Sequence, residues 1–277
     1  MSAVLEAMAE IPVQRPVAAR LRGVTRVYGE GTVRQVHALG PVDLDLAQGE
    51  FFSVVGPSGC GKSTLLDVLA GLSPPTRGTV EFEGQPVRGV PDGVGVVFQE
   101  DASFPWLTVE NNVAFGLRRA GVAAAEIRRR VDYATRFMGL RDFRNAYPAQ
   151  LSGGMRQRVC IARTLVLRPR LILLDEPFGA LDQQTRLVMG DELLRLWRET
   201  GATVLLITHS LDEAAMLSDR VGVMSAKPGV FIEVAETHWP RDRDSRIMAD
   251  PRFGALNGQI WDRLRAETLK HMRVSGT

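Results

Sequence analysis

A phosphate-binding pattern constrains the fold of this chain more than any other feature. Residues 56–64 fit G-x-x-x-x-G-K-[ST] without a mismatch. They are Gly56, Pro57, Ser58, Gly59, Cys60, Gly61, Lys62, Ser63 and Thr64. An apolar run over 50–55 precedes them, and leucines at helical spacing over 65–69 follow. Strand, loop and helix in this order predict an α/β core with a parallel sheet and an anion site at the loop.

The chemistry expected of this loop is the binding of a nucleoside triphosphate. Its glycines let several backbone N–H groups point at one anion, and the helix that follows adds the positive end of its dipole. We expect Lys62 to reach the outer phosphates of ATP, and the Ser63 hydroxyl to bind the Mg²⁺ that bridges them. The alternative is a glycine-rich turn that binds nothing.

Composition adds limits but names no partner. A chain of 277 residues with 45% hydrophobic and 24% charged residues suits one large or two small soluble α/β domains. A net charge of +2 does not favour nucleic acid. The two cysteines form neither a disulfide framework nor a zinc pattern, which favours a reducing, cytosolic setting. No run approaches the ~18 apolar residues that would cross a bilayer, and the start of the chain lacks the features of a signal peptide.

The pattern along the chain suggests four regions. Residues 1–18 are expected to form a flexible arm, and strand patterns over 19–27 and 42–46 predict an antiparallel unit before the phosphate loop. Tyr28, expected in a loop, either stacks on adenine or is an exposed turn residue. Residues from about 105 to 165 have a helical pattern and few strand signals, which predicts a helical insertion.

Three further buried strands are predicted to end in polar residues. The strand over 93–98 ends at Gln99, where α/β folds place ligand contacts. Four apolar residues from 171 run into Asp175 and Glu176, and adjacent desolvated carboxylates repel unless a cation or separate roles accommodate them. We expect Asp175 to hold Mg²⁺ and Glu176 to orient or deprotonate the attacking water. A charged loop after a core strand is the alternative.

The strand over 203–208 ends at His209, which is either structural or catalytic. Ser210 and Glu213 then match a capping box for the next helix.

A second anion cradle is predicted at Leu151-Ser152-Gly153-Gly154, where a hydroxyl and two glycines open a helix. The stretch 151–158 resembles the LSGGQ-type signature of ABC ATPases. One triphosphate does not need two cradles from one subunit. In that family a head-to-tail dimer closes the signature of one subunit on the ATP held by the other, which implies that Ser152, Gly153 and Gly154 contact ATP of the partner subunit. Met155 is expected to pack the signature helix.

The other motifs resemble the same family over about residues 20–235. Tyr28 is similar to the adenine-stacking aromatic, Gln99 to the Q-loop glutamine, Asp175 and Glu176 to the Walker B pair, Asp182 to the D-loop aspartate and His209 to the switch histidine. The resemblance implies a P-loop NTPase core of mostly parallel sheet with flanking helices, an N-terminal antiparallel β subdomain and a helical insertion. The ATPase domain would span 19–235, followed by a helical extension over 236–277. The resemblance implies that the catalytic residues are Lys62, Gln99, Glu176 and His209. It also implies that Ser63, Gln99 and Asp175 bind Mg²⁺ and that Asp182 contacts the nucleotide.

A narrower likeness points to a transport role. The stretches 104–113, 177–186 and 223–229 and the tail over 250–264 look like the nitrate, sulfonate and taurine group of bacterial importer ATPases. This implies uptake of a small anion-like solute through two separate membrane permease subunits, supplied by an extracytoplasmic binding protein. A second ATPase subunit, identical or related, would complete the assembly at the cytoplasmic face of the inner membrane. Phe104 to Leu107 are expected to form an exposed docking surface; the alternative is that Trp106 and Leu107 pack inward.

A soluble ABC ATPase acting on DNA or ribosomes is the alternative function. Chromosome-type members resemble a cassette split by a long coiled coil, and no sustained heptads lie between Thr64 and Leu151. Ribosome-type members carry two cassettes, whereas each motif occurs once here. A module that no longer hydrolyses ATP would be expected to have lost a catalytic position, but Lys62, Asp175, Glu176 and His209 are all present. The sequence therefore favours the importer, with no nucleic acid partner, and leaves the solute open.

Overall fold

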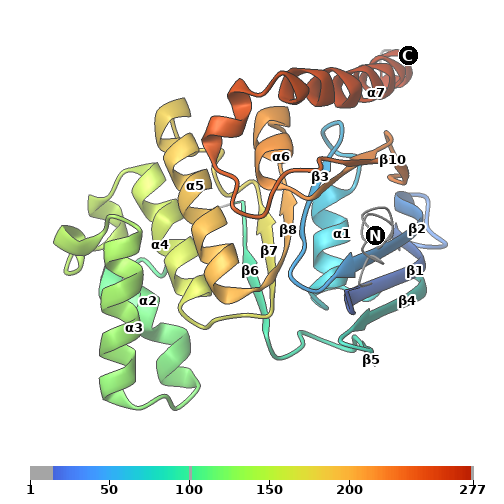
Figure 1. The fold of residues 1–277 in the computed structure, drawn as a ribbon. Coiled ribbons are helices and arrows are strands. Elements are labelled where there is room, and N and C mark those ends of the chain that lie inside the picture. The colour runs from blue at the N-terminus through green and yellow to red at the C-terminus, as the bar shows by residue number, and fades with distance from the viewer. Residues whose placement is uncertain (1–14, 100–101, 276–277) are drawn as a thin grey trace, which may run out of the picture.

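The computed structural model describes residues 15–99 and 102–275, with two sheets and helices around them (Figure 1). The smaller sheet has the order β2-β1-β4-β5 and is antiparallel. Its strands are β1 (Val17–Tyr28), β2 (Val36–Ala47), β4 (Arg77–Phe82) and β5 (Gln85–Pro86). The predicted antiparallel strands are therefore present and longer than expected. Tyr28 is the last residue of β1, so its predicted place in a loop was wrong. The predicted arm lies almost wholly outside the described residues.

The larger sheet has the order β10-β9-β3-β8-β7-β6. Neighbouring strands from β9 to β6 are parallel, and β10 joins β9 in the antiparallel sense. The strands are β3 (Phe51–Val55), β6 (Val94–Val97), β7 (Leu171–Asp175), β8 (Thr203–Ile207), β9 (Arg220–Met224) and β10 (Phe231–Glu236). Because parallel strands end at the same edge of the sheet, the polar residues predicted after β3, β6, β7 and β8 share that edge.

Alternate residues of the buried strands face two different cores. Phe51 and Val204 belong to the cluster that also contains residues of the helices α4 and α5. Phe52 and Leu205 belong to the second cluster, together with Leu65 and residues of β1 and β2. The strands therefore consist of continuous apolar residues, as sheets buried on both faces do. The helices against the central sheet are α1 (Lys62–Leu69), α4 (Gly153–Leu165), α5 (Gln183–Thr200) and α6 (Leu211–Leu217).

The region predicted as a helical insertion consists of helices and 3₁₀ turns, at the lower left of Figure 1. They are α2 (Val109–Arg119), α3 (Ala124–Phe137), η1 (Arg141–Phe143), η2 (Pro148–Gln150) and α4 (Gly153–Leu165). Val113 of α2 and Val131 of α3 lie in the same apolar cluster as Ile172 of the central sheet. The insertion therefore shares its core with the sheet instead of forming one of its own, and the predicted domain limits remain predictions.

The chain after β10 crosses the top of the molecule in Figure 1. It contains η3 (Ser245–Ala249) and α7 (Pro251–Ser275). Phe253, Leu256 and Ile260 bury one face of α7 in the main core. Among the described residues, no helix combines the length and apolar character that spanning a membrane requires.

Candidate active site

The phosphate loop connects β3 to α1 and lies against β2. Gly61 has φ 108°, and a Cβ on it would come within 2.5 Å of the Ala38 carbonyl oxygen. Only glycine therefore fits at this position without a shift. Gly61 is also the N-cap of α1, and no described side chain caps that helix start. The first N–H groups of α1 are thus available to an anion, as the sequence predicted for the loop.

Lys62 lies inside the loop. Its side chain is buried, and Nζ donates hydrogen bonds to the carbonyl oxygens of Gly56 at 2.9 Å and Pro57 at 3.0 Å. The Sγ atom of Cys60 lies 3.9 Å from Nζ, and burial raises the pKa of that thiol. The partners of the ammonium group in these contacts are neutral. A phosphate oxygen can therefore replace them and gain a charge-assisted hydrogen bond.

Asp175 ends β7 as a buried carboxylate. Burial raises its pKa, and a hydrogen bond from Ser63 and the charge of Lys62 act in the opposite direction. A hydroxyl and a carboxylate in contact suit Mg²⁺, which prefers oxygen ligands. Across the described residues, no group of three or more His, Cys, Asp or Glu side chains forms a metal site. A Mg²⁺ ion here would therefore rely on phosphate oxygens and water for its remaining ligands, which is how this ion is held in nucleotide sites.

Glu176 points to a different set of partners. Its Oε2 atom accepts a hydrogen bond from Gln99 Nε2 at 3.1 Å and lies 3.2 Å from His209 Nδ1. Glu176 has φ 46°, and its backbone N–H donates to the Ile207 carbonyl at 2.9 Å. The structure thus brings together Gln99, Glu176 and His209 from three neighbouring strands. Gln99 follows β6 by two residues, since that strand ends at Val97 and is shorter than predicted.

The two adjacent carboxylates of the Walker B pair therefore have separate surroundings. Asp175 faces Ser63 and Lys62, whereas Glu176 faces Gln99 and His209. Their mutual repulsion still contributes, because the charge of Glu176 raises the pKa of Asp175. The arrangement fits one carboxylate that binds a cation and another that acts on water.

Tyr28 lies at the end of the antiparallel sheet and is 39% exposed. The guanidinium carbon of Arg26 is 4.6 Å from the centre of its ring. One face of the ring is therefore covered by a cation, an arrangement that stabilises the ring position. Stacking of adenine on Tyr28 stays a prediction, and it requires the other face or displacement of Arg26.

The signature residues open α4 at the surface. Ser152 is exposed and caps the helix by accepting a hydrogen bond from the Met155 N–H at 3.2 Å. Met155 packs against the main core, as expected. In the described part of the chain, no hydrogen bond joins Ser152, Gly153 or Gly154 to the phosphate loop. Their exposure fits a contact with another subunit.

Asp182 lies close to the signature helix. A Cβ on Gly154 would come within 2.6 Å of the Leu181 side chain, so the two segments touch. The Asp182 carboxylate caps α5 through the N–H and hydroxyl of Thr185, and these bonds lower its pKa. The structure thus gives Asp182 a local partner, and its contact with nucleotide stays a prediction.

Sequence reasoning missed a buried network behind His209. Ser210 caps α6 as predicted, but the Glu213 carboxylate does not return to the Ser210 N–H, so that half of the capping box was wrong. Glu213 instead accepts a hydrogen bond from Thr208 Oγ1 at 2.6 Å and lies 3.2 Å from Arg186 Nε. Ser210 N–H donates to Thr208 Oγ1. These hydrogen bonds fix the residues that flank His209. The only sign of this network in the sequence was Arg186, which lies one helical turn after Asp182.

The chain is similar to known proteins of one family. A model described as ABC transporter matches residues 39–179. The taurine import ATP-binding protein of Jannaschia sp. is 44% identical over 235 residues, which are 82% of this chain and 88% of the relative. The nitrate import ATP-binding protein of Synechocystis sp. is 42% identical over 236 residues, 83% and 89% of the two chains.

Two other similarities extend the comparison. The spermidine/putrescine import ATP-binding protein of Rubrobacter xylanophilus is 50% identical over 214 residues, 76% of this chain and 55% of the relative. A solved dimeric ATP-binding cassette, in a post-hydrolysis state bound to ADP and phosphate, superposes with a TM-score of 0.73 at 33% identity. That match covers 80% of this chain and 100% of the cassette.

Proposed function

Because the chain belongs to the ABC transporter family of ATP-binding, ATP-hydrolysing proteins, we propose that it energises a bacterial importer for a small anion-like solute. The observation that carries the proposal is an exposed aromatic group that follows Gln99 in the chain. The motor itself would have two linked parts, a site that hydrolyses ATP and a surface that contacts a membrane subunit.

Hydrolysis would use the side chains gathered at the carboxyl edge of the central sheet. Lys62 would bind the outer phosphates, and Glu176 would accept a proton from the attacking water. His209 and Gln99, both in contact with Glu176 Oε2, would hold that carboxylate and the water in position. Mg²⁺ bound by Ser63, Asp175 and Gln99 supplies charge neutralisation at the phosphates.

A second ATPase subunit is proposed to complete the site. Ser152, Gly153 and Gly154 would bind the triphosphate held by the partner through the exposed start of α4. The dimeric cassette that this chain resembles supports a dimer of this kind. Either an identical or a related subunit would serve as the partner.

The proposed solute class rests on the relatives. Those named for taurine and nitrate import are matched over at least 88% of their length. The relative named for spermidine and putrescine is matched over 55% of its length, so less of that protein has a counterpart here. The solute itself would be bound by the permease and an extracytoplasmic binding protein. Transport of taurine, nitrate and putrescine by the reconstituted complex would test the class, and uptake of putrescine alone would refute it.

The surface for the membrane subunit is the aromatic turn, which we define as residues 104–107. Trp106 is 70% exposed, so it does not pack inward, whereas Phe104 and Leu107 are half-buried and the turn is less exposed than predicted. Its ring lies 5.6 Å from that of Phe104, which in turn lies 4.6 Å from the ring of Phe115 on α2. Several apolar side chains together at a surface mark a site for a partner. Docking here would place the protein at the cytoplasmic face of the inner membrane.

The buried side chain of Asn112 holds the turn in place. Its Oδ1 accepts from the Phe104 N–H at 2.8 Å, and its Nδ2 donates to the carbonyls of Phe104 and Leu107. A fully buried amide with satisfied hydrogen bonds fixes the backbone around it. Removal of an exposed ring from this turn should therefore leave the fold intact.

Replacing Trp106 with Ala is expected to reduce assembly with the permease at least about tenfold, since a central aromatic side chain often contributes 2 kcal/mol or more to an interface. ATP binding by the isolated subunit should stay unchanged. Pull-down with the permease and solute-driven uptake in proteoliposomes measure the loss. The matched control is Trp261→Ala, an exposed tryptophan on α7. Normal uptake by the Trp106 variant would refute docking at the aromatic turn.

A further inference from the structure

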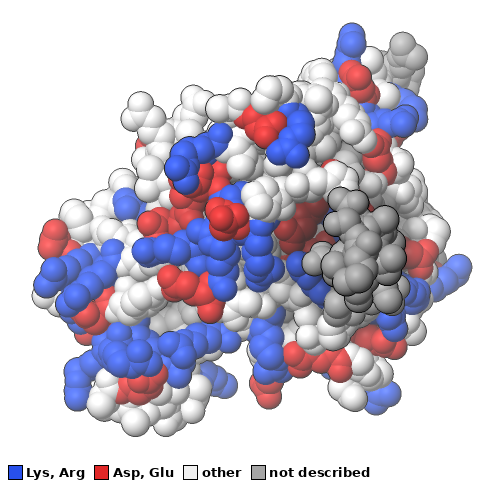
Figure 2. Space-filling view, in the orientation of Figure 1, with Lys and Arg blue, Asp and Glu red and all other residues white. Residues whose placement is uncertain are grey.

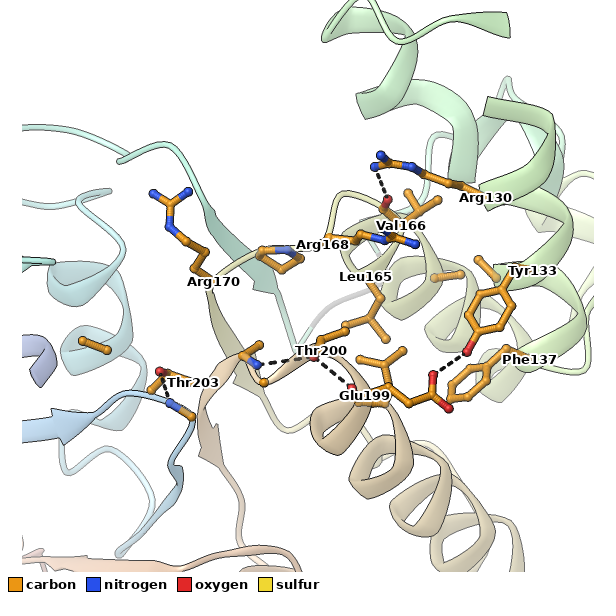
Figure 3. Close-up of a pocket in the computed structure, with 18 of the residues that line it drawn as sticks. Arg130, Tyr133, Phe137, Leu165, Val166, Arg168, Arg170, Glu199, Thr200 and Thr203 are labelled. Atoms are coloured by element: carbon orange, nitrogen blue, oxygen red, sulfur yellow. Dashed lines mark hydrogen bonds between the residues drawn. The ribbon is translucent and has the colours of Figure 1, made fainter. Parts of the chain in front are cut away.

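A cavity lies away from the nucleotide site, at the edge of the central sheet where the strands begin. It has a volume of about 640 Å³. One wall is α3, and the opposite wall is the end of α5 with the turn into β8 (Figure 3). The segment before β7 closes a third side. We call it the basal pocket. Its volume lies within the range of small-molecule sites, which is roughly 300–1,000 Å³.

Positively charged side chains outnumber negatively charged ones around the basal pocket. Four arginines, from α3 and from the segment before β7, line the pocket together with two glutamates. These residues are Arg129, Arg130, Arg168, Arg170, Glu83 and Glu199. Positive side chains also gather over α3 at the lower left of Figure 2. The lining therefore carries a net positive charge and favours an anion.

Arg168 differs from the other arginines of the pocket. Arg129 and Arg130 pair with Glu126, and Arg170 pairs with Glu83. Among the described residues, no carboxylate pairs with Arg168. Its backbone has φ 55°, a conformation that costs energy for a residue other than glycine. Figure 3 shows its side chain extending from the segment before β7 into the pocket. This guanidinium is thus free for a carboxylate, sulfonate or phosphate.

Another part of the basal pocket is lined by aromatic rings. Tyr133 and Phe137 stack with ring centres 5.8 Å apart on α3, and Leu165 of α4 lies beside them. The Tyr133 hydroxyl donates to Glu199 at 2.9 Å and joins the two walls. Burial, and then this hydrogen bond, raise the pKa of Tyr133. The negative charge of Glu199 lies at this aromatic end. A bound anion would therefore place its flat apolar part near the rings and its charge near Arg168.

We propose that the basal pocket binds a small organic anion with a flat apolar body, with Arg168 as its anionic anchor. The site is distinct from the phosphate loop, because its residues come from the opposite edge of the central sheet. A ligand there would contact α3 of the helical insertion and the α5–β8 turn at once. It would therefore stabilise the insertion against the sheet.

Naphthalene-1-sulfonate serves as the probe, and the protein is kept saturated with MgADP so that the nucleotide site is filled. Calorimetry should give one bound probe per chain, and the methyl NMR signals of Leu165 and Val166 should shift on binding. Arg168→Gly removes the guanidinium and suits the positive φ. It should weaken binding about tenfold, which is the order expected for one charge-assisted hydrogen bond. The matched control is Arg265→Ala, an exposed arginine on α7.

Two further probes separate the charge from the apolar contact. Neutral 1-naphthalenemethanol and inorganic phosphate should each bind more weakly than naphthalene-1-sulfonate, because each lacks one half of the recognised chemistry. Equal affinity of Arg168→Gly and the wild type, or methyl shifts confined to residues outside the pocket, would overturn the proposal. If 1-naphthalenemethanol bound as tightly as naphthalene-1-sulfonate, the proposed role of the anionic charge at Arg168 would be overturned.

Discussion

Replacing Glu176 with Gln is expected to lower ATP turnover by about 10²- to 10⁴-fold while ATP still binds, which is the range for loss of a general base. The amide keeps the size of the side chain and the hydrogen-bond position at Gln99, but it has no basic oxygen for the proton of the attacking water. Release of phosphate under saturating MgATP measures turnover. Because hydrolysis is blocked after binding, the variant should accumulate as an ATP-bound dimer on size exclusion.

The matched control for this variant is Glu236→Gln, which makes the same change at an exposed glutamate on β10. It should hydrolyse ATP at the wild-type rate. Near-normal turnover by Glu176→Gln would contradict the role of Glu176 as base, and it would leave Glu176 as a residue that only positions Gln99 and His209.

Replacing Lys62 with Ala is expected to weaken ATP binding by roughly 10- to 100-fold, the equivalent of the 1.5–3 kcal/mol contributed by a hydrogen bond to a charged group. The physical reason is the position of Nζ, which is buried in the loop and bonded to the carbonyls of Gly56 and Pro57. The loss of those two bonds also leaves loop carbonyls without a donor. Fluorescent ATP titration of the isolated subunit measures the affinity.

Lys270→Ala is the control, since Lys270 is an exposed lysine on α7 that pairs with Glu267 of the same helix. Lys270 does not belong to the phosphate loop, so the ATP affinity of this variant should match the wild type. If Lys62→Ala bound ATP as tightly as Lys270→Ala, the interpretation of residues 56–64 as a phosphate loop would be refuted.

The main architecture was predictable from local patterns. The buried strands over 51–55, 171–175 and 203–207 are continuous apolar runs, and each leads into a residue type that the site uses. Because parallel strands share an edge, the sequence predicted Gln99, Glu176 and His209 at one edge of the sheet. Their contact also depends on the neighbouring positions of β6, β7 and β8, which the sequence did not predict. Strand patterns over 19–27 and 42–46 and the helical pattern over about 105–165 also predicted the antiparallel sheet and the helical insertion. The resemblance to ABC ATPases implied the same arrangement, which the fold confirms.

Contacts between distant side chains were not predictable in the same way. Glu213 matched a capping box, and local hydrogen bonding alone would have directed its carboxylate to Ser210. The nearby Thr208 hydroxyl and the cation of Arg186 offered stronger partners once the helices α5 and α6 had packed together. The basal pocket depends likewise on α3, α5 and the segment before β7, which meet only in the folded chain. No sequence spacing brings these segments together.

The hydrogen bonds of Asn112 have a mechanical consequence. This residue belongs to α2, yet its amide is bonded to the backbone of the aromatic turn at both Phe104 and Leu107. A force applied to Trp106 therefore cannot bend the turn without breaking buried hydrogen bonds, which is costly away from water. We therefore expect the turn and the amino-terminal end of α2 to move together, so that a displacement of Trp106 is passed to the first helix of the insertion.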